Sequence, residues 1–159
     1  METALRKHLS GGAFTRVTAQ RSEAMRAVKG KGNRTTERSL RLGLVRAGIG
    51  GWTMHPADIS GKPDFFFPDA RLAVFVDGCF WHGCPRCGHF PKTNRSFWRA
   101  KIERNRERDV AHSRCLRRQG LRVLRLWEHD VQNDIVHCID RISAAACPKR
   151  GRVNEATAK

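Results

Sequence analysis

Apolar side chains recur at helical spacing in three segments of the chain. In residues 35–47 the apolar positions include Leu40 and Leu44, which lie one helical turn apart after a threonine that can cap the helix. Residues 94–119 contain no Gly or Pro, and the glycine that follows them is typical of a helix end. Residues 131–145 predict a last helix. We therefore expect three helices, of which the second is the longest.

Short apolar runs predict four strands between and after these helices. Residues 52–59 predict a strand that Pro56 interrupts, and residues 64–67 and 72–76 predict a hairpin. Residues 121–127 predict the fourth strand. The run 72–76 is apolar throughout, so we expect a central strand that is covered on both faces. The order of helix, three strands, helix, strand and helix indicates an α/β fold, with a mixed central sheet flanked by helices.

Length and composition indicate a single domain with polar ends. The chain has 159 residues, 40% of them hydrophobic, which is enough for a core of its own. Residues 1–33 are basic with few apolar anchors, so we expect an arm that is mostly mobile without a partner. Residues 34–147 form the expected folded domain, and the polar tail 148–159 is expected to be disordered. We find no membrane-spanning run and no secretory signal, so we expect a cytoplasmic protein.

Charge points to the class of partner. Lys and Arg number 31 against 15 Asp and Glu, which gives a net charge of +16. A polyanion, above all a nucleic acid, is the expected partner of such a chain. Two basic segments, residues 1–50 and 92–128, flank the slightly acidic residues 51–91. We expect this arrangement where an anionic polymer is held on two sides of a site for metal cations. Solvated helix faces account poorly for an excess this large.

Two carboxylates lie at the ends of adjacent predicted strands. Asp64 begins the first strand of the hairpin, and Asp77 follows the second. Such groups can meet in space and offer the oxygen ligands that Mg²⁺ prefers. Asp beside a turn is more often a plain turn residue, so the pair alone leaves both interpretations open.

A cluster of cysteines in the predicted loop 78–93 indicates a zinc site. It contains Cys79, Cys84 and Cys87. Three thiolates this close on a loop fit three corners of a tetrahedral zinc site better than they fit a core. His89, His129 and Cys115 are candidates for the fourth ligand. We prefer His129 because it follows a predicted strand, where site residues tend to lie.

The long predicted helix and the cysteine loop carry further candidates. Asn105 and Asp109 lie in the middle of an otherwise apolar helix face, so they need partners, which Asp64 and His82 would provide. A helix face at the solvent edge is the alternative. Aromatic side chains on the loop and the helix can stack on bases or wedge between them. They are Phe80, Trp81 and Trp98, to which Met25 and Val28 of the arm add a weaker case.

Several motifs occur in one combination over about residues 21–130: Arg21–Ser22, Met25–Ala27, Gly61–Phe65, Val74–Cys84, Arg95–Trp98, Asn105–Asp109 and Trp127–His129. In this combination the chain resembles the very short patch repair DNA mismatch endonucleases. The resemblance implies a restriction-endonuclease-like fold with a structural zinc. It also implies a monomeric enzyme of the cytoplasm and nucleoid that nicks one DNA strand 5′ to the T of a T:G mismatch. Such mismatches arise when 5-methylcytosine is deaminated.

The same resemblance implies roles for individual residues. Asp64 matches the Mg²⁺ ligand, His82 the catalytic base and Asp109 an aspartate that supports it, while Glu37 stands where the family has an acid on its first helix. The implied zinc ligands are Cys79, Cys84, Cys87 and His129, with His89 as a substitute. The implied DNA contacts are Phe80, Trp81, Trp98, Asn105, Met25, Val28 and Arg26. The implied partner is double-stranded DNA with a T:G mismatch, and mismatch-repair proteins or a cognate cytosine methyltransferase are further candidates.

The sequence also departs from the best-known form of the motif. Val76 and Asp77 replace a Thr-His pair, so Val76 offers Mg²⁺ its backbone carbonyl and Asp77 adds a carboxylate. Cys79 stands where the wider nuclease superfamily often has lysine, which leaves the proton transfer to His82. Two alternatives stay open. One is a restriction-like or transposon-associated nuclease without mismatch specificity, and the other is a zinc-containing DNA-binding module without catalysis.

Overall fold

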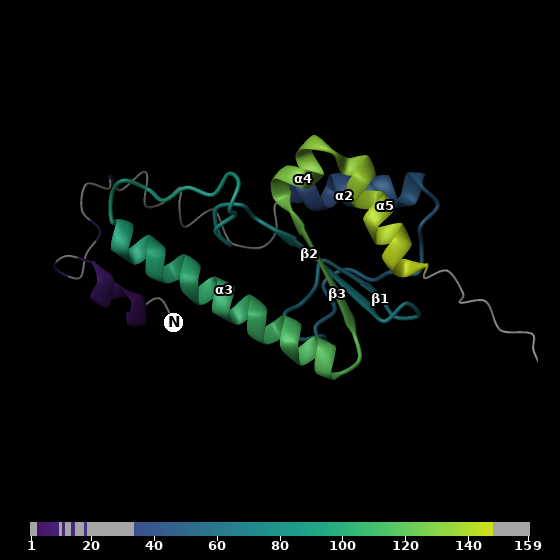
Figure 1. The fold of residues 1–159 in the computed structure, drawn as a ribbon, viewed down its shortest axis with the longest axis horizontal. Helices are drawn as coiled ribbons and strands as arrows, with labels where there is room; N and C mark the ends of the chain where they lie inside the picture. The colour runs from purple at the N-terminus through teal and green to yellow at the C-terminus, as the bar shows by residue number, and fades with distance from the viewer. Residues whose placement is uncertain (1–2, 10, 12–13, 15–17, 19–33, 148–159) are drawn as a thin grey trace, which may run out of the picture.

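The computed structural model describes residues 3–9, 11, 14, 18 and 34–147. Its elements are η1 (Thr3–His8), α2 (Arg34–Arg46), β1 (Phe65–Phe67), β2 (Leu72–Asp77), α3 (Arg95–Arg118), β3 (Arg122–Trp127), α4 (Glu128–Asn133) and α5 (Ile135–Ala146). Helices α2, α4 and α5 gather on one side of the small sheet, and the long helix α3 runs along the other side (Figure 1). In the described part of the chain, no helix has the length and apolar character needed to cross a bilayer.

The sheet is mixed, as the sequence predicts. Its strand order is β1-β2-β3, with β1 antiparallel to β2 and β3 parallel to β2. The register places Phe65 opposite Val74 and Val74 opposite Leu124. Parallel strands need a long crossover, and α3 provides it. The ends of β2 and β3 therefore point the same way, and the segments that follow them emerge at one edge of the sheet.

Strand β2 is covered on both faces, which confirms its prediction as a central strand. Leu72 and Val74 face the core that α2 and α5 close, whereas Ala73 and Phe75 face the side where Leu116 of α3 packs. All of them are buried. Alternate side chains of a strand point to opposite faces, so an apolar run without alternation needs a layer on each side.

Two predicted elements are wrong. The strand expected over residues 52–59 is reduced to a single bridge between Thr53 and Phe66. The backbone turns away after it, because His55 adopts a left-handed conformation (φ 48°) and Pro56 follows. The single helix expected over residues 131–145 is two helices, α4 and α5. Asp134 separates them, since its backbone is not helical (φ −148°, ψ 73°) and its carboxylate accepts a hydrogen bond from the His137 amide at 2.9 Å.

The described part of the N-terminal arm packs on the start of α3. Leu5 and Leu9 are buried against Phe97, and the Ser96 hydroxyl donates to the His8 carbonyl at 2.6 Å. Two apolar side chains thus anchor a segment in which the sequence suggests few. Met25, Arg26 and Val28, most of the arm and the tail 148–159 lie outside the described residues, so the expectations for them stay predictions.

Candidate functional site

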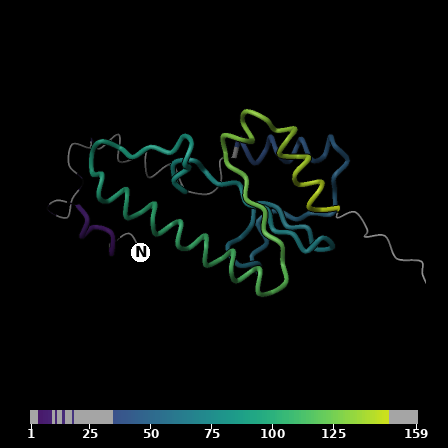
Figure 2. Tube along the Cα trace, viewed as in Figure 1, coloured from purple at the N-terminus to yellow at the C-terminus, as the bar shows by residue number. Residues whose placement is uncertain are grey.

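The loop after β2 runs back along the N-terminal half of α3 (Figure 2). The Asn105 side-chain amide of α3 donates to the Trp81 carbonyl at 2.9 Å, which fixes the loop on the helix. Gly83 has a positive φ of 62°, and a Cβ there would lie 2.8 Å from the Ile102 side chain. Glycine is therefore required for this close approach. The loop and the helix together hold His82 at the edge of the sheet.

Four ligand-type side chains meet where the β2 loop and the start of α4 come together. The Nδ1 atom of His129 lies 3.2 Å from Cys79 Sγ, 3.6 Å from Cys84 Sγ and 3.4 Å from Cys87 Sγ. Zinc bonds of ordinary length in a tetrahedron would place ligand atoms roughly 3.5–3.8 Å apart. The structure thus brings together the four residues that we prefer from the sequence. His89 lies apart from them, with its ring 5.7 Å from that of Phe80.

One hydrogen bond ties this cluster together. The Cys79 amide donates to the Glu128 carboxylate at 3.1 Å, which fixes the loop on α4. The Nε2 atom of His129 lies 3.1 Å from an oxygen of Asp130, but it is buried without a hydrogen-bond partner in the described structure. A carboxylate on the far nitrogen is the usual way to orient a metal-binding imidazole, and Asp130 lies close to that position.

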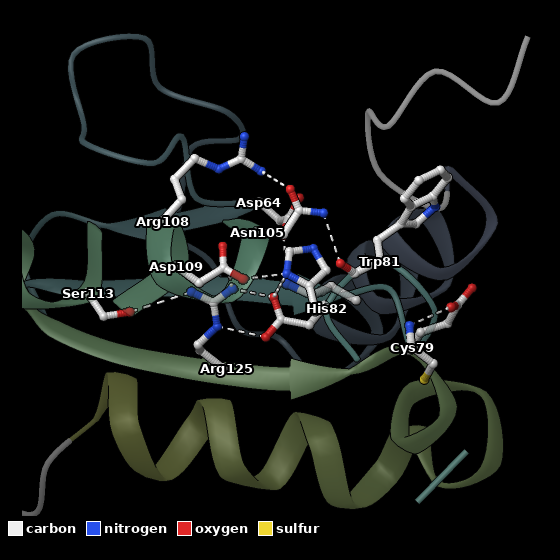
Figure 3. A network of polar contacts seen from close by, with 12 residues as sticks. Asp64, Cys79, Trp81, His82, Asn105, Arg108, Asp109, Ser113 and Arg125 are labelled. Atoms are coloured by element: carbon white, nitrogen blue, oxygen red, sulfur yellow. Dashed lines mark hydrogen bonds and ion pairs between the residues drawn. The ribbon is translucent and has the colours of Figure 1, made fainter. Parts of the chain in front are cut away.

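His82 is held by Asp109 of α3. The two side chains meet at 2.5 Å between Nδ1 and Oδ2 (Figure 3). A proton on Nδ1 serves this hydrogen bond, so Nε2 is left as the nitrogen that can accept a proton. Burial works to raise the pKa of Asp109, but the hydrogen bond and charge of His82 and the charges of Arg125 and Arg108 outweigh it and lower the pKa. Asp109 therefore stays ionised beside the imidazole.

Asp77 lies on the same side and is paired with Arg125 of β3. The guanidinium donates to Oδ2 at 2.6 Å from Nε and to Oδ1 at 2.5 Å from Nη2. It also lies 3.4 Å from Asp109 and stacks over the Phe75 ring at 4.9 Å. Both carboxylate oxygens of Asp77 are thus engaged by one cation. Coordination of Mg²⁺ by Asp77, which the sequence suggests, stays a prediction and would require Arg125 to release them.

Asp64 lies in a different environment at the start of β1. Its Oδ2 accepts a hydrogen bond from the Val76 amide at 2.6 Å, and its side chain is 15% exposed. The charged or ligand-type groups that act on it are Glu37 of α2, His55 and Asp77. Burial raises the pKa of Asp64 to about 6, and the charges of Glu37 and Asp77 add to this increase, while the Val76 hydrogen bond and His55 oppose it. This carboxylate is therefore placed where a cation would stabilise its ionised form.

The aromatic candidates form one cluster where the loop after β2 meets the start of α3. The ring of Phe80 lies 5.0 Å from that of Trp81 and 5.4 Å from that of Trp98. All three side chains are partly exposed. The Asn105 amide is bonded to the Trp81 backbone, so in this structure Asn105 supports the loop. A role of Asn105 in DNA contact stays a prediction.

Sequence reasoning misses two residues of the site. Arg125 is a half-buried cation that interrupts the apolar run 123–127 of β3, and such an interruption is a signal that a charged partner lies nearby. His55 follows no local motif, because its contacts with Glu37 and Asp64 depend on how the segment before β1 folds over α2.

Carboxylates and an aspartate-held imidazole at the edge of a mixed sheet, in a strongly basic chain, are the features expected of a metal-dependent nuclease. The family model described as DNA mismatch endonuclease Vsr matches residues 14–87. The type II nicking enzyme V.NaeI of Lentzea aerocolonigenes is 38% identical over 138 residues, which cover 84% of this chain and 82% of that enzyme.

A second relative carries the family's own name. The DNA mismatch endonuclease Vsr of Escherichia coli K12 is 38% identical over 113 residues, which cover 69% of this chain and 70% of that protein. The type II nicking enzyme V.NmeDIP of Neisseria meningitidis serogroup C is 38% identical over 83% of this chain and 89% of its own length. The chain belongs to the Vsr family and is a DNA endonuclease, a hydrolase of phosphodiester bonds. The mixed three-stranded sheet with its helices fits the restriction-endonuclease-like fold.

Proposed function

We propose that this endonuclease nicks one strand of duplex DNA 5′ to the T of a T:G mismatch in very short patch repair. The observation that carries the proposal is the His82–Asp109 pair at 2.5 Å, which lies beside the Asp77 carboxylate and directly follows Trp81 of the partly exposed aromatic cluster. The names of several relatives, type II nicking enzymes, support cleavage of a single strand. The resemblance to mismatch endonucleases supports the choice of substrate.

His82 is the proposed base. Its Nε2 accepts a proton from the water that attacks the phosphorus atom, and the P–O bond to the leaving 3′ oxygen breaks. Asp109 keeps the imidazole in the required tautomer and stabilises the cation that forms. The leaving oxygen takes its proton from water. Each of these roles depends on the contact that α3 makes with the loop.

The residues around Asp64 fit a divalent cation. Asp64 offers a carboxylate without a lysine or arginine among the ion pairs that the structure describes, and the Val76 carbonyl belongs to the adjacent strand end. Buried Glu37 keeps one oxygen without a hydrogen-bond partner in the described structure. When bound there, Mg²⁺ would neutralise charge on the phosphate and favour ionisation of the attacking water.

The cysteine cluster fits a structural zinc ion. With Cys79, Cys84, Cys87 and His129 as ligands, all four corners are filled by protein and none is left for substrate. Such a site would hold the loop that carries Phe80, Trp81 and His82. We expect about one zinc per chain in elemental analysis after dialysis. A metal-free protein that keeps its fold would refute this part of the proposal.

The aromatic cluster supports selectivity for mismatches. A mispaired base is easier to unstack than a paired one, so side chains that wedge into the stack convert weak pairing into preferential binding. Phe80, Trp81 and Trp98 are the proposed wedges, and Met25, Val28 and Arg26 of the arm are proposed to act from the minor groove. We expect a monomer at the nucleoid in the cytoplasm, with mismatch-repair proteins or a cognate cytosine methyltransferase as further partners.

A denaturing-gel nicking assay with Mg²⁺ tests the proposal. Duplexes with a T:G mismatch in varied methyltransferase-type contexts are compared with matched T:A duplexes and with lanes that contain EDTA. We expect a single cut 5′ to the mismatched T, absent from both controls and from His82→Ala. Equal cutting of matched duplexes would favour a nuclease without mismatch specificity. Tight binding without cleavage in any context would favour the non-catalytic DNA-binding module.

A further inference from the structure

Three ligand-type side chains converge on the Asp64 side of the sheet. Glu37 comes from the first turn of α2, His55 from the segment between α2 and β1, and Asp64 from the residue before β1. One ligand atom of each lies within 4.8 Å of the others. The family resemblance gives roles to Asp64 and Glu37 and none to His55.

The imidazole of His55 spans the two carboxylates unequally. Its Nε2 lies 3.1 Å from Glu37 Oε2, which is hydrogen-bond distance, and its Nδ1 lies 3.8 Å from Asp64 Oδ1, which is not. If Nε2 donates its proton to Glu37, Nδ1 presents a lone pair toward a carboxylate oxygen. Two electron-rich atoms that face each other in this way are stabilised by a cation between them.

Glu37 provides a second, independent observation. Its side chain is only 9% exposed, and Oε1 is buried without a hydrogen-bond partner in the described part of the structure. A buried carboxylate oxygen in this state is costly unless another group compensates it. The ion pairs that the structure describes for Glu37 and Asp64 involve His55 alone. A bound cation would satisfy the orphaned oxygen.

His55 itself lies where an ion can arrive from solvent. Its side chain is 48% exposed, whereas the two carboxylates behind it are buried or nearly so. Its left-handed backbone (φ 48°) turns the chain out of the short bridge at Thr53. The imidazole thus forms the outer wall of the cluster.

We propose that His55 is a ligand of the divalent cation held by Asp64 and Glu37, so that this site accepts first-row transition ions such as Mn²⁺. The proposal rests on the proposed function in taking the cation at Asp64 as the one used in cleavage. Imidazole nitrogen is a good ligand for transition ions, whereas Mg²⁺ prefers oxygen ligands and retains its water. His55 therefore raises the affinity for Mn²⁺ more than the affinity for Mg²⁺.

Pulsed electron paramagnetic resonance of bound Mn²⁺ tests this proposal without DNA and without turnover. The protein is kept replete with zinc, so that His129 cannot supply a nitrogen to Mn²⁺. We expect nitrogen modulation from one imidazole in the wild type and its loss in His55→Ala. The Kd for Mn²⁺ should rise about 10-fold or more, by analogy with losses around other metal sites. The Kd for Mg²⁺, measured by competition, should change much less.

Matched variants keep the result interpretable. His55→Asn tolerates the left-handed backbone better than alanine, so it separates loss of the ligand from strain. His137→Ala removes an exposed imidazole from α5 and should leave the nitrogen modulation unchanged. Nitrogen modulation that persists in both His55 variants, or an unchanged Kd for Mn²⁺ in both, would overturn the proposal.

The variant Asp64→Asn distinguishes failure of the His55 proposal from failure of the proposed function. If Asp64→Asn abolishes Mn²⁺ binding and the His55 variants do not alter it, the cation site stands and His55 is excluded as a ligand. If Mn²⁺ binds equally well to Asp64→Asn, the site at Asp64 is refuted together with the metal ligand of the proposed reaction.

Discussion

Asp64 and Asp77 lie at the two ends of one hairpin, but their surroundings are opposite. Asp77 is buried, and Arg125 donates hydrogen bonds to both of its carboxylate oxygens. Asp64 is also mostly buried, yet it has a backbone amide, a second carboxylate and an exposed imidazole as neighbours. Among the described residues, Arg125 neutralises Asp77, whereas the ion pairs of Asp64 include no lysine or arginine.

This difference separates two functions of a buried carboxylate. A carboxylate that is neutralised within the protein can position its neighbours, as the Asp77–Arg125 pair does beside Asp109 and His82. A carboxylate that lacks an internal cation is destabilised by burial, and its pKa rises to about 6 at Asp64. That unfavourable state is relieved when a divalent cation binds. We therefore propose Asp64, and not Asp77, as the ligand of the catalytic metal.

The largest expected effect is on the nicking rate and comes from Asp64, the proposed metal ligand. Asp64→Asn should lower the nicking rate about 10³-fold, because a metal that stabilises the transition state contributes several kcal/mol. Single-turnover rates at saturating enzyme measure this. Asp69→Asn changes an exposed aspartate in the hairpin turn and serves as the control. A rate for Asp64→Asn that is similar to that of Asp69→Asn would contradict the assignment.

The next largest expected effect on the nicking rate comes from Asp109, which orients the His82 imidazole. Asp109→Asn should lower the nicking rate about 10²-fold, since the amide favours the wrong tautomer of His82 and removes the charge that stabilises its cation. The fold should be retained, because asparagine keeps the shape of the side chain. Glu107→Gln, an exposed change on the same helix, is the matched control in the same assay. Equal rates for the two variants would exclude Asp109 as the residue that orients the base.

A smaller effect on stability comes from Arg125. Arg125→Met should lower the free energy of unfolding by about 2 kcal/mol, because it leaves the buried Asp77 carboxylate without a partner. Asp77→Asn in the same chain should recover part of that loss. Urea unfolding of the two single variants and the double variant gives the coupling free energy. Additive effects would mean that the pair is not coupled, against the contacts that the structure shows.

A second effect on stability, of similar size, is a gain that depends on pH. The pKa of Asp64 in the folded protein, about 6, lies above its unfolded value, 3.8, so the folded state binds this proton more tightly. The resulting stabilisation is full at low pH and is lost as the pH rises through about 6. Metal-free Asp64→Asn should therefore be more stable than the wild type by about 2 kcal/mol near pH 8, with little difference near pH 4. Urea unfolding at both pH values in EDTA measures this, and a destabilised variant at high pH would contradict it.

The sequence reveals those parts of the site that follow from local signals. Cys79, Cys84 and Cys87 lie on one short loop, and His129 follows a strand parallel to the one before that loop, so their meeting is a matter of strand order. Asp109 stands out as a polar residue within an apolar helix face. The apolar run of β2 requires cover on both faces, which the structure confirms.

What the sequence conceals depends on tertiary context. His55 lies in a segment whose pattern predicts a strand, and the left-handed turn at that residue brings its ring to Glu37 and Asp64. The break at Asp134 is a helix cap that an apolar pattern does not reveal. Arg125 reaches Asp77 because the parallel register places Arg125 opposite Phe75, two residues before Asp77. The amino-acid pattern of the two strands does not reveal this register.

The most direct test of the difference between the two sides is the position of the bound ion. Crystals of the zinc-replete protein soaked in MnCl₂ are measured by anomalous diffraction above and below the manganese edge. Our account predicts a manganese peak between Asp64, Glu37 and His55, and none beside Asp77, where Arg125 stays in place. A manganese peak beside Asp77, with Arg125 displaced, would contradict the account.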